Sequence, residues 1–264
     1  MEFTDQLHRT IILDKAPARI VSLVPSQTEL LHSLGLDERV VGITKFCVHP
    51  AEWFRSKTRV GGTKNVHLDQ VRALQPDLII ANKEENTRAD IEALMKEFPV
   101  WVSDIHSLED ALGMIAGVGA LTQRSAKAAA MIAEIEQDFA ALQPLSGVRT
   151  AYFIWREPWM VAGNDTFIHQ MLQRCGLTNV YGHVPRYPDI SLKQLATTDC
   201  ELIFLSSEPY PFKEKHIAEL QELIPAARIQ LVDGEYFSWY GSRLKGAPAY
   251  FSGLIASLRE AGFQ

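Results

Sequence analysis

Short apolar strands alternate with helices along the chain, and this alternation restricts the possible folds more than any other feature of the sequence. The β-branched run at residues 19–24 is followed by a helical segment that ends at Gly35, and the next strand is expected at residues 40–44. The same order continues with helix 68–74, strand 78–81, helix 87–98 and strand 100–102. Strands that alternate with helices at this spacing predict parallel βα units.

The start of the first helix carries a second local signal. Pro25 follows the strand directly, and Ser26 and Glu29 have the three-residue spacing of a capping box. In such a box each of the two side chains accepts a hydrogen bond from a backbone N–H at the start of the helix. The sequence therefore predicts a buried strand that turns at once into a capped helix.

A long helical stretch separates this series from a second one. Residues 107–142 are rich in helix-forming residues and are interrupted near Gly117, Gly119 and Thr122, so we predict two consecutive helices. The second, at about residues 124–142, would be roughly 28 Å long at 1.5 Å per residue. The second series comprises strand 150–155, helix 166–175, helix 192–196, strand 202–206, helix 213–223, a strand in QLVD and a C-terminal helix.

These two series predict an α/β protein of two Rossmann-like lobes, each with a parallel sheet, joined by a single long helix. The expected domains are an N-terminal lobe at residues 1–122, a connecting helix at 123–144 and a C-terminal lobe at 145–264. An internal repeat supports two lobes, because residues 68–85 and 192–209 match at a constant offset of 124. The matched pairs include Leu68 with Leu192, Ile79 with Ile203 and Glu84 with Glu208. The alternative is that the shared βα pattern alone produces these matches.

Charge and composition exclude several classes of protein. The net charge is −6, so the basic surface typical of nucleic-acid or anionic-membrane binding is missing. No apolar run approaches the ~18 residues of a membrane span. The N-terminus carries Glu2 and Asp5 and has no apolar leader, so the chain as given is expected to be cytoplasmic, or periplasmic if a leader was removed.

The usual catalytic motifs are missing too. The sequence has no phosphate loop, no complete dinucleotide fingerprint, no His-Glu-x-x-His and no Gly-x-Ser-x-Gly. The three cysteines, Cys47, Cys175 and Cys200, form neither a disulfide framework nor a Cys-x-x-Cys pattern. Only Cys47 and His49 place two soft-metal ligands close together, and a structural zinc site would need two more.

Aromatic and polar residues gather instead in the loops that follow the strands. Ligands in parallel α/β proteins bind outside the carboxyl ends of strands, where these loops emerge. We therefore expect an aromatic-lined ligand cleft between the two lobes, although core or rim packing would explain any single ring. The candidate ligand-binding residues are Phe46, His49, Trp155, Arg156, Trp159, Tyr187, Trp239, Tyr240 and Arg243.

Five segments, which cover nearly the whole chain in order, resemble the cobalamin- and iron-complex-binding proteins of ABC importers. These segments are RIVSLVPSQTELLHSLGLDERVVGIT, VGGTKNVHLDQVRALQPDLIIA, AGNDTFIHQMLQRCGLTNV, YPDISLKQLA and DGEYFSWYGSRL. The resemblance implies the class III periplasmic-binding-protein fold, in which one rigid helix joins two α/β lobes. It also implies a non-enzymatic binding function, with no intrinsic cofactor. The implied ligand is a metal chelate, which is haem, a ferric siderophore, or a corrinoid such as cobalamin.

The resemblance assigns roles to individual positions. His49 stands where cobalamin binders place an aromatic residue before a proline, and its imidazole is a candidate ligand for the metal of the chelate. The alternative for His49 is a hydrogen bond to a loop carbonyl. Trp159 and Tyr187 correspond to ring-packing aromatics of the second lobe, and Arg243 corresponds to an arginine near the pocket. A Trp159→Ala change is expected to weaken binding about tenfold.

Three positions, Thr63, Asn82 and Lys193, depart from the family pattern. Thr63 and Asn82 stand where cobalamin binders carry tryptophans. Members that dock on a permease present one acidic residue on each lobe, and here these positions are Asp69 and Lys193. A lysine would repel the permease arginine, so docking is expected to be weakened.

Three hypotheses for function remain open at this point. The first is a binder of a metal chelate, expected to be monomeric, with an ABC permease as a possible partner. The second is a cytoplasmic sensor or carrier of the same fold. The third is a chelatase-like enzyme of tetrapyrrole or metal handling, in which Cys47 and His49 would serve the chemistry.

Overall fold

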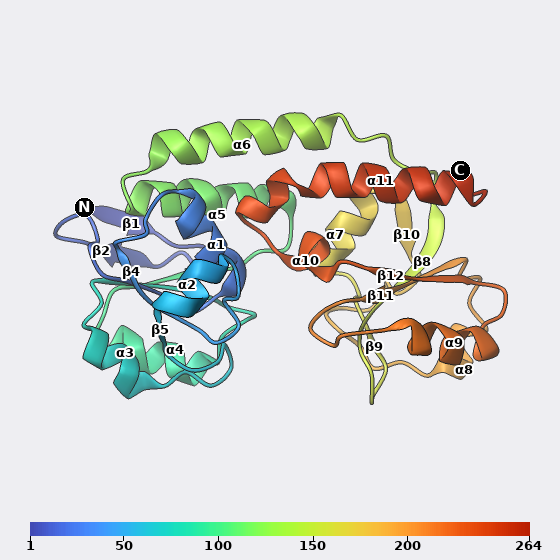
Figure 1. Cartoon of the computed structure of the whole chain (residues 1–264), viewed down its shortest axis with the longest axis horizontal. Coiled ribbons are helices and arrows are strands. Elements are labelled where there is room, and N and C mark those ends of the chain that lie inside the picture. Colours follow the sequence, from blue (N-terminus) through green and yellow to red (C-terminus); the bar gives the residue numbers. More distant parts are fainter. The chain divides into compact units, whose positions relative to one another are not determined.

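A parallel sheet with the same order of four strands occurs twice in the chain (Figure 1). The first sheet has the order β5-β4-β3-β6-β7, with β3 at Ile20–Ser22, β4 at Val40–Ile43, β5 at Thr58–Arg59, β6 at Leu78–Asn82 and β7 at Val100–Ser103. The second has the order β10-β8-β11-β12, with β8 at Val148–Trp155, β10 at Leu177–Asn179, β11 at Leu202–Ser206 and β12 at Arg228–Val232. The short strand β9, Met160–Val161, pairs antiparallel with β8. The predicted α/β class with parallel sheets is confirmed.

Helices connect the strands of both sheets. Those that precede β8 are α1 at Pro25–Ser33, α2 at Ala51–Ser56, α3 at Leu68–Leu74, α4 at Arg88–Met95, α5 at Leu108–Leu121 and α6 at Ser125–Ala140. Those that follow β8 are α7 at Phe167–Arg174, α8 at Leu192–Leu195, α9 at Glu214–Leu223, α10 at Gly234–Ser238 and α11 at Ala247–Glu260, with a 3-10 turn at Ser242–Lys245. An antiparallel hairpin of β1, Glu2–Thr4, and β2, Thr10–Ile12, precedes the first sheet.

The computed structural model describes residues 1–264, which form two units. The first unit contains Met1–Ile105, Glu109–Ile135 and Tyr240–Arg243, and the second contains His106–Leu108, Glu136–Trp239 and Leu244–Gln264. The predicted pair of consecutive helices is confirmed as α5 and α6. With 16 residues, α6 is roughly 24 Å long, shorter than expected. The domain boundaries at residues 122 and 144 stay a prediction.

The strand order fixes where each unit can bind a ligand. In the first unit the chain goes from β3 to β4 on one side and later to β6 on the other, so the order reverses between β3 and β6. In the second unit the same reversal falls between β8 and β11. Ligands of open parallel sheets bind at such a switch point, outside the carboxyl ends of the strands. Each unit therefore has one defined edge for ligand contacts.

The internal repeat is also visible in the fold. Helices α3 and α8 begin at Leu68 and Leu192, and strands β6 and β11 span residues 78–82 and 202–206, all at the offset of 124. Both strands lie next to the first strand of their sheet. The matched segments are thus equivalent parts of two units with the same topology.

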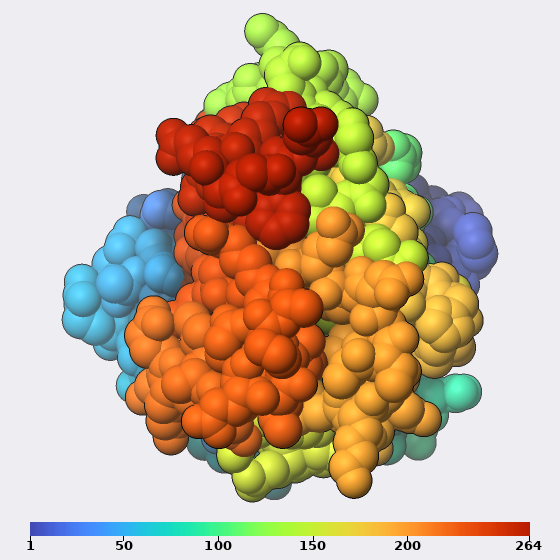
Figure 2. Space-filling view, turned by 90° about the vertical axis from the view of Figure 1, so that its right-hand side faces the viewer, coloured from blue at the N-terminus to red at the C-terminus, as the bar shows by residue number.

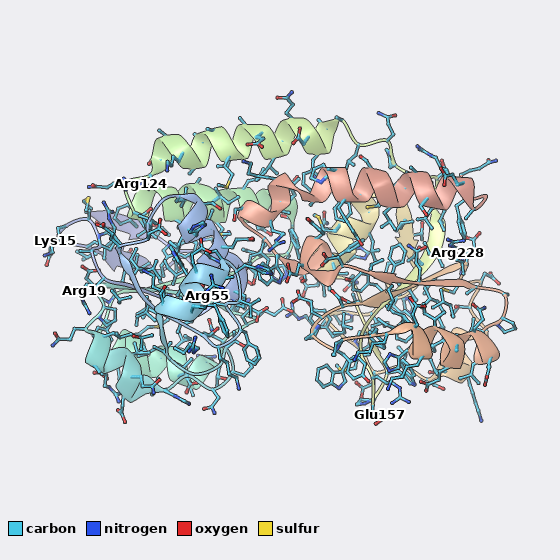
Figure 3. The ribbon with its side chains drawn as sticks, viewed as in Figure 1. Lys15, Arg19, Arg55, Arg124, Glu157 and Arg228 are labelled. Atoms are coloured by element: carbon cyan, nitrogen blue, oxygen red, sulfur yellow. The ribbon has the colours of Figure 1, made fainter.

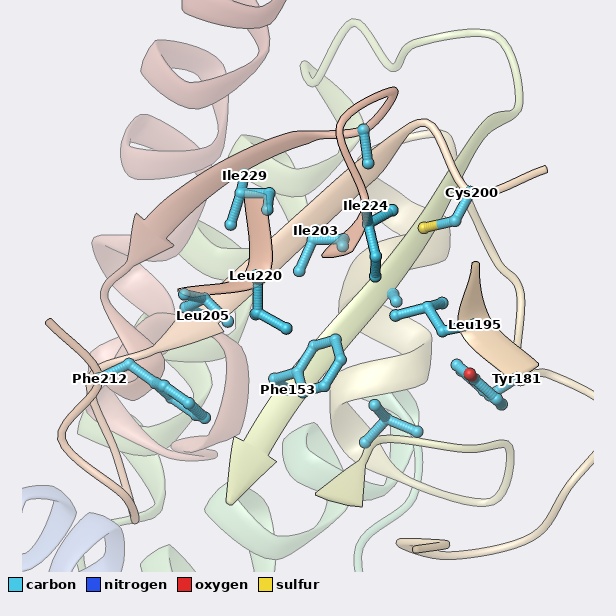
Figure 4. Close-up of a cluster of buried hydrophobic side chains, with 13 residues drawn as sticks. Phe153, Tyr181, Leu195, Cys200, Ile203, Leu205, Phe212, Leu220, Ile224 and Ile229 are labelled. Atoms are coloured by element: carbon cyan, nitrogen blue, oxygen red, sulfur yellow. The ribbon is translucent and has the colours of Figure 1, made fainter. Parts of the chain in front are cut away.

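Apolar side chains cover both faces of each sheet, as parallel sheets require. In the second unit, Phe153, Ile203 and Leu205 point to a core shared with α8 and α9 (Figure 4). Their neighbours along the strands point to the other face, where Tyr152 and Phe204 contact Phe237 of α10. Figure 2 shows the surface of this unit, with α11 in red and the chain around α9 in orange.

The capping-box prediction for the first helix is wrong. Val24 is the N-cap residue, no side chain caps the helix, and Pro25 occupies its first turn. Because proline has no N–H and is already set to helical φ, it starts the helix without a cap. The predicted end is confirmed, since Gly35 follows the helix with a φ of 77°. The short elements β1, β2, α2, β5, β9, β10 and α10 were not predicted, because segments of two to six residues show too little periodicity.

Candidate ligand-binding site

The loop after β4 presents an aromatic ring at the carboxyl edge of the first sheet. Phe46 is 51 % exposed, and the ammonium of Lys45 lies 5.0 Å from its ring centroid. His49 is half-buried in the same loop. Between them Cys47 is fully buried, and its Sγ lies 3.0 Å from Thr28 Oγ1 and 3.1 Å from Thr44 Oγ1. Burial encloses the Cys47 side chain and raises the pKa of its thiol, so the loop offers Phe46 and His49, rather than Cys47, to a ligand.

The edge of the first sheet is held by an asparagine that the sequence analysis missed. Asn86 Nδ2 donates to the carbonyls of Leu23, 3.2 Å away, and Thr63, 3.1 Å away, while its Oδ1 accepts the N–H of Asn82 at 2.9 Å. These backbone groups follow or end β3, β5 and β6. One buried side chain therefore joins the loops on both sides of the switch point.

Asn82, which stands where the cobalamin binders carry a tryptophan, has a structural role. Its Oδ1 accepts the N–H groups of Glu84 and Glu85, both at 2.9 Å, and its Nδ2 donates to Ser103 Oγ at 2.9 Å. Asn82 is 2 % exposed, so it shapes the loop after β6 and offers almost no surface of its own.

Arg243 also belongs to the first unit. Its Nη2 and Nε donate to the two carboxylate oxygens of Glu29 on α1, at 2.7 and 3.1 Å. The neighbouring Tyr240 is 6 % exposed. The pair of bonds fixes the guanidinium against α1, because a forked geometry orients both partners.

An aromatic group lies at the carboxyl end of β8 in the second unit. Trp155 is 40 % exposed and meets Tyr210 edge-on, with 5.7 Å between ring centroids. Trp159 is stacked on Phe212 at 6.1 Å, with 9° between the planes. The guanidinium of Arg156 lies 5.5 Å from the Trp159 ring centroid. Trp155, Arg156 and Trp159 are thus brought together at the edge where the second sheet can bind a ligand.

Arg156 is held in place by carboxylates. Its Nη2 and Nε donate to the two carboxylate oxygens of Glu219, at 2.9 and 3.2 Å. Glu157, labelled in Figure 3 on the loop after β8, also pairs with Arg156. These contacts raise the pKa of the guanidinium, Glu219 first among them. The positive charge of Arg156 is therefore already balanced within the unit.

The remaining two candidates of the second unit differ in exposure. Tyr187 is half-buried, with the guanidinium of Arg186 5.6 Å from its ring centroid. Trp239 is only 7 % exposed, and its Nε1 donates to Glu208 Oε1 at 2.7 Å. Most of the Trp239 ring is thus packed inside the protein. The sequence analysis did not select Glu208 as a site residue, although the internal repeat already paired it with Glu84.

No group of three or more His, Cys, Asp and Glu side chains could hold a metal ion. A metal ligand role for His49 would therefore depend on a chelate that supplies the other ligands itself. This role, and the expected cleft that joins the candidates of both units, stay predictions.

The two candidate docking residues lie on equivalent helices. Asp69 on α3 is 96 % exposed in its side chain and accepts a bond from Arg72 Nη1 at 2.8 Å. Lys193 on α8 is exposed. Their opposite charges therefore mark the same position of the two units.

Two pockets lie in the first unit, and neither contains a candidate ligand residue. The larger, about 370 Å³, lies between α4 and the loop after β1 and is lined by Leu7, Ile91 and Met95 among others. The smaller, about 230 Å³, lies between the N-terminal hairpin and β7. Both pockets are lined in part by residues of the N-terminal hairpin region, and neither is lined by Phe46 or Trp155.

Two units of equal topology, each with aromatic side chains at its switch point, define a two-lobed α/β solute-binding protein. The chain matches the periplasmic binding protein family over residues 20–229 and belongs to that family. No helix of the structure combines the length and apolar character needed to cross a membrane.

Relatives and solved structures agree with this assignment. A vitamin B12-binding protein of Pectobacterium carotovorum is 22 % identical over 236 residues, which cover 86 % of this chain and 84 % of that protein. A vitamin B12-binding protein of Vibrio parahaemolyticus is 26 % identical over 195 residues, 71 % and 70 % of the two chains. Both relatives are named for binding and not for catalysis, so the chelatase hypothesis is abandoned.

The fold is shared with proteins of different ligands. The periplasmic haem-binding protein BhuT, solved with two haems, has a TM-score of 0.79 and 21 % identity, over 94 % of this chain and 99 % of that chain. The vitamin B12-binding protein BtuF of Vibrio cholerae has a TM-score of 0.75 and 20 % identity, over 92 % and 98 %. Both are class III periplasmic binding proteins, so the predicted fold is confirmed.

Proposed function

We propose that this protein binds a metal chelate without chemical change and delivers it to an ABC importer. The chelate would be one of three kinds: haem, a ferric siderophore, or a corrinoid such as cobalamin. The observation that carries the proposal is the exposure of large aromatic rings, Phe46 and Trp155, at the carboxyl edges of the two sheets. Exposed rings of this size at a ligand-binding edge favour a partner with flat or apolar surfaces.

The named relatives support the same ligand class. They include vitamin B12-binding proteins, haem-binding proteins and a protein of an Fe³⁺-hydroxamate transport system. Aromatic side chains suit all three kinds of ligand, because ring stacking and apolar contact depend little on the identity of the metal.

The permease partner belongs to the same proposal. Asp69 on α3 would pair with a basic residue of the permease, since its carboxylate is almost fully exposed. Lys193 at the equivalent position of α8 would repel such a residue. A carrier or sensor that never meets a permease is the second candidate function, and Lys193 is the observation that favours it.

Binding is tested directly with the purified protein. Cyanocobalamin, hemin and a ferric hydroxamate are each added, and quenching of tryptophan fluorescence and retention of the coloured ligand in equilibrium dialysis are measured. We expect saturable binding of at least one chelate with a one-to-one limit. Failure of all three to bind would reject the proposed function.

A further inference from the structure

Glu208 lies at the switch point of the second sheet. It follows β11 by two residues, and β11 and β8 are the strands between which the order reverses. The loop that contains Glu208 is tied to β8, because the N–H of Tyr210 donates to the carbonyl of Ile154 at 3.3 Å. The carboxylate is therefore placed on the edge where a ligand of this unit would bind.

One oxygen of this carboxylate is fixed by the protein and the other is not. Trp239 Nε1 and Ser238 Oγ both donate to Oε1, each at 2.7 Å. No hydrogen bond or ion pair from the protein reaches Oε2. The side chain is thus held in one orientation, and Oε2 can still accept a hydrogen bond from a ligand.

The approach of α10 to this loop needs a glycine. A Cβ on Gly234 would lie 2.3 Å from Ser206 Oγ and 2.8 Å from Glu208 Cγ, distances that real Cβ atoms do not reach. Gly234 therefore lets α10, which ends at Ser238 just before Trp239, pack directly against Glu208.

The surroundings of Glu208 are acidic. No arginine or lysine pairs with its carboxylate, and Asp233 and Glu235 at the start of α10 repel it. Burial, followed by Glu235 and then Asp233, raises the pKa of Glu208, while the bonds from Ser238 and Trp239 lower it. An uncompensated carboxylate in this position attracts N–H donors and repels anions.

We propose that Glu208 Oε2 accepts a hydrogen bond from an amide N–H of the bound chelate, and that this selects an amide-bearing corrinoid over haem. The inference rests on the proposed function and makes its ligand class narrower. Corrinoids carry neutral primary amides around the ring, whereas haem carries two anionic propionates. An acceptor suits the amides, and its negative charge opposes the propionates.

The arginine of the second unit's aromatic group points the same way. Arg156 is bound to Glu219. A propionate would have to compete with this carboxylate for the guanidinium group. A neutral ligand with N–H donors does not compete with a carboxylate for a guanidinium group.

The test compares Glu208→Gln with Glu222→Gln, a control that removes one exposed carboxylate from α9 of the same unit. Glutamine keeps the size of the side chain and an oxygen for Trp239, but presents an NH₂ group in place of Oε2. Affinities for cyanocobalamin and hemin are measured by equilibrium dialysis at pH 7. We expect Glu208→Gln to weaken cyanocobalamin binding about tenfold, a typical effect of losing one hydrogen bond to a charged group. We expect hemin binding to stay within twofold or to become tighter, and Glu222→Gln to change neither.

A pH profile separates a ligand contact from a purely structural role. In the wild type, cyanocobalamin affinity should fall in acid as the Glu208 carboxylate takes up a proton, and this fall should be missing in Glu208→Gln. The other titratable groups that face Glu208, namely Asp233, Glu235 and Tyr152, are the same in both proteins. The profile also keeps the test decisive if Glu208→Gln is less stable.

The outcomes distinguish the two proposals. A wild type that binds neither these chelates nor a ferric hydroxamate rejects the proposed function and this inference with it. A wild type that binds chelates, with equal effects of Glu208→Gln on cyanocobalamin and hemin or with an unchanged pH profile, rejects this inference alone.

Discussion

The indole ring of Trp159 lies parallel to the phenyl ring of Phe212, with 6.1 Å between centroids and 9° between planes. Phe153 meets the same indole edge-on at 5.6 Å, and Arg156 lies 5.5 Å from its centroid. Trp159 is therefore part of the second core as well as a candidate ligand contact. A change at this residue affects stability and binding together.

We expect Trp159→Ala to lower the free energy of unfolding by about 3 kcal/mol, a typical loss for deleting a large ring from a packed site. Urea denaturation followed by circular dichroism measures the change. Trp155→Ala is the control, since Trp155 is 40 % exposed and has a single ring contact, with Tyr210. An equal decrease in the free energy of unfolding in the two variants would mean that the stacking of Trp159 on Phe212 adds no stability beyond that of an exposed ring.

Phe46→Ala should separate binding from stability. The ring is 51 % exposed, so its removal leaves little cavity, and we expect unfolding to change by less than about 1 kcal/mol. Affinity for the chelate should fall about tenfold, which corresponds to roughly 1.4 kcal/mol of lost contact. Ile12→Ala removes another exposed apolar side chain, on β2, and should leave affinity unchanged. Loss of affinity in both variants would point to a general effect on the first unit.

His49→Ala tests metal ligation by spectroscopy. If the imidazole contributes an axial nitrogen to the bound metal, the absorption bands of a bound corrinoid or haem should shift in the variant. His183→Ala, at an exposed position of the second unit, should leave the spectrum as it is in the wild type. Identical spectra for wild type and His49→Ala would show that His49 is not a ligand, while the aromatic site would still stand.

Much of the fold follows from local signals that need no partner. Strand β11 occupies the predicted residues 202–206, and α3 the predicted residues 68–74. A short continuous apolar run is sufficient to predict β11, and α3 ends at its C-cap residue Gln75, which adopts the left-handed conformation just before Pro76. Strand β10 pairs with β8 over three residues, and its existence depends on that pairing rather than on its own composition.

The sequence could predict where along the strands the candidate residues lie, but it could not predict which other residues they contact. Parallel topology places Phe46 and Trp155 at strand ends, and both rings are exposed there, while their role in ligand binding stays a prediction. Trp239 is buried and donates to Glu208, 31 residues earlier in the chain, a contact that no periodicity encodes. The same holds for Asn86, whose bond to the Leu23 carbonyl spans 63 residues. Long-range hydrogen bonds of this kind need the structure.

The last prediction concerns His216, a buried histidine at the start of α9 that is 3 % exposed. The N–H of Lys213 donates to its Nδ1 at 2.9 Å, so the proton is on Nε2, which lies 3.4 Å from the Tyr210 hydroxyl. Burial first, and then the charges of Lys215 and Arg156, lower the pKa of His216 below its ordinary value of 6.5. The unfolded chain therefore binds this proton more readily than the folded protein does.

Stability should consequently fall as the pH decreases below about 6.5, because protonation of His216 favours the unfolded state, and it should be independent of this group at higher pH. His216→Asn keeps an acceptor for Lys213 and removes the titration. We expect the wild type to lose more unfolding free energy than His216→Asn between pH 7 and pH 5, as measured by urea denaturation at each pH. Contributions of other groups, including the half-buried His169, cancel in this difference. Parallel stability curves for the two proteins would contradict the assignment of a neutral His216 in the folded state.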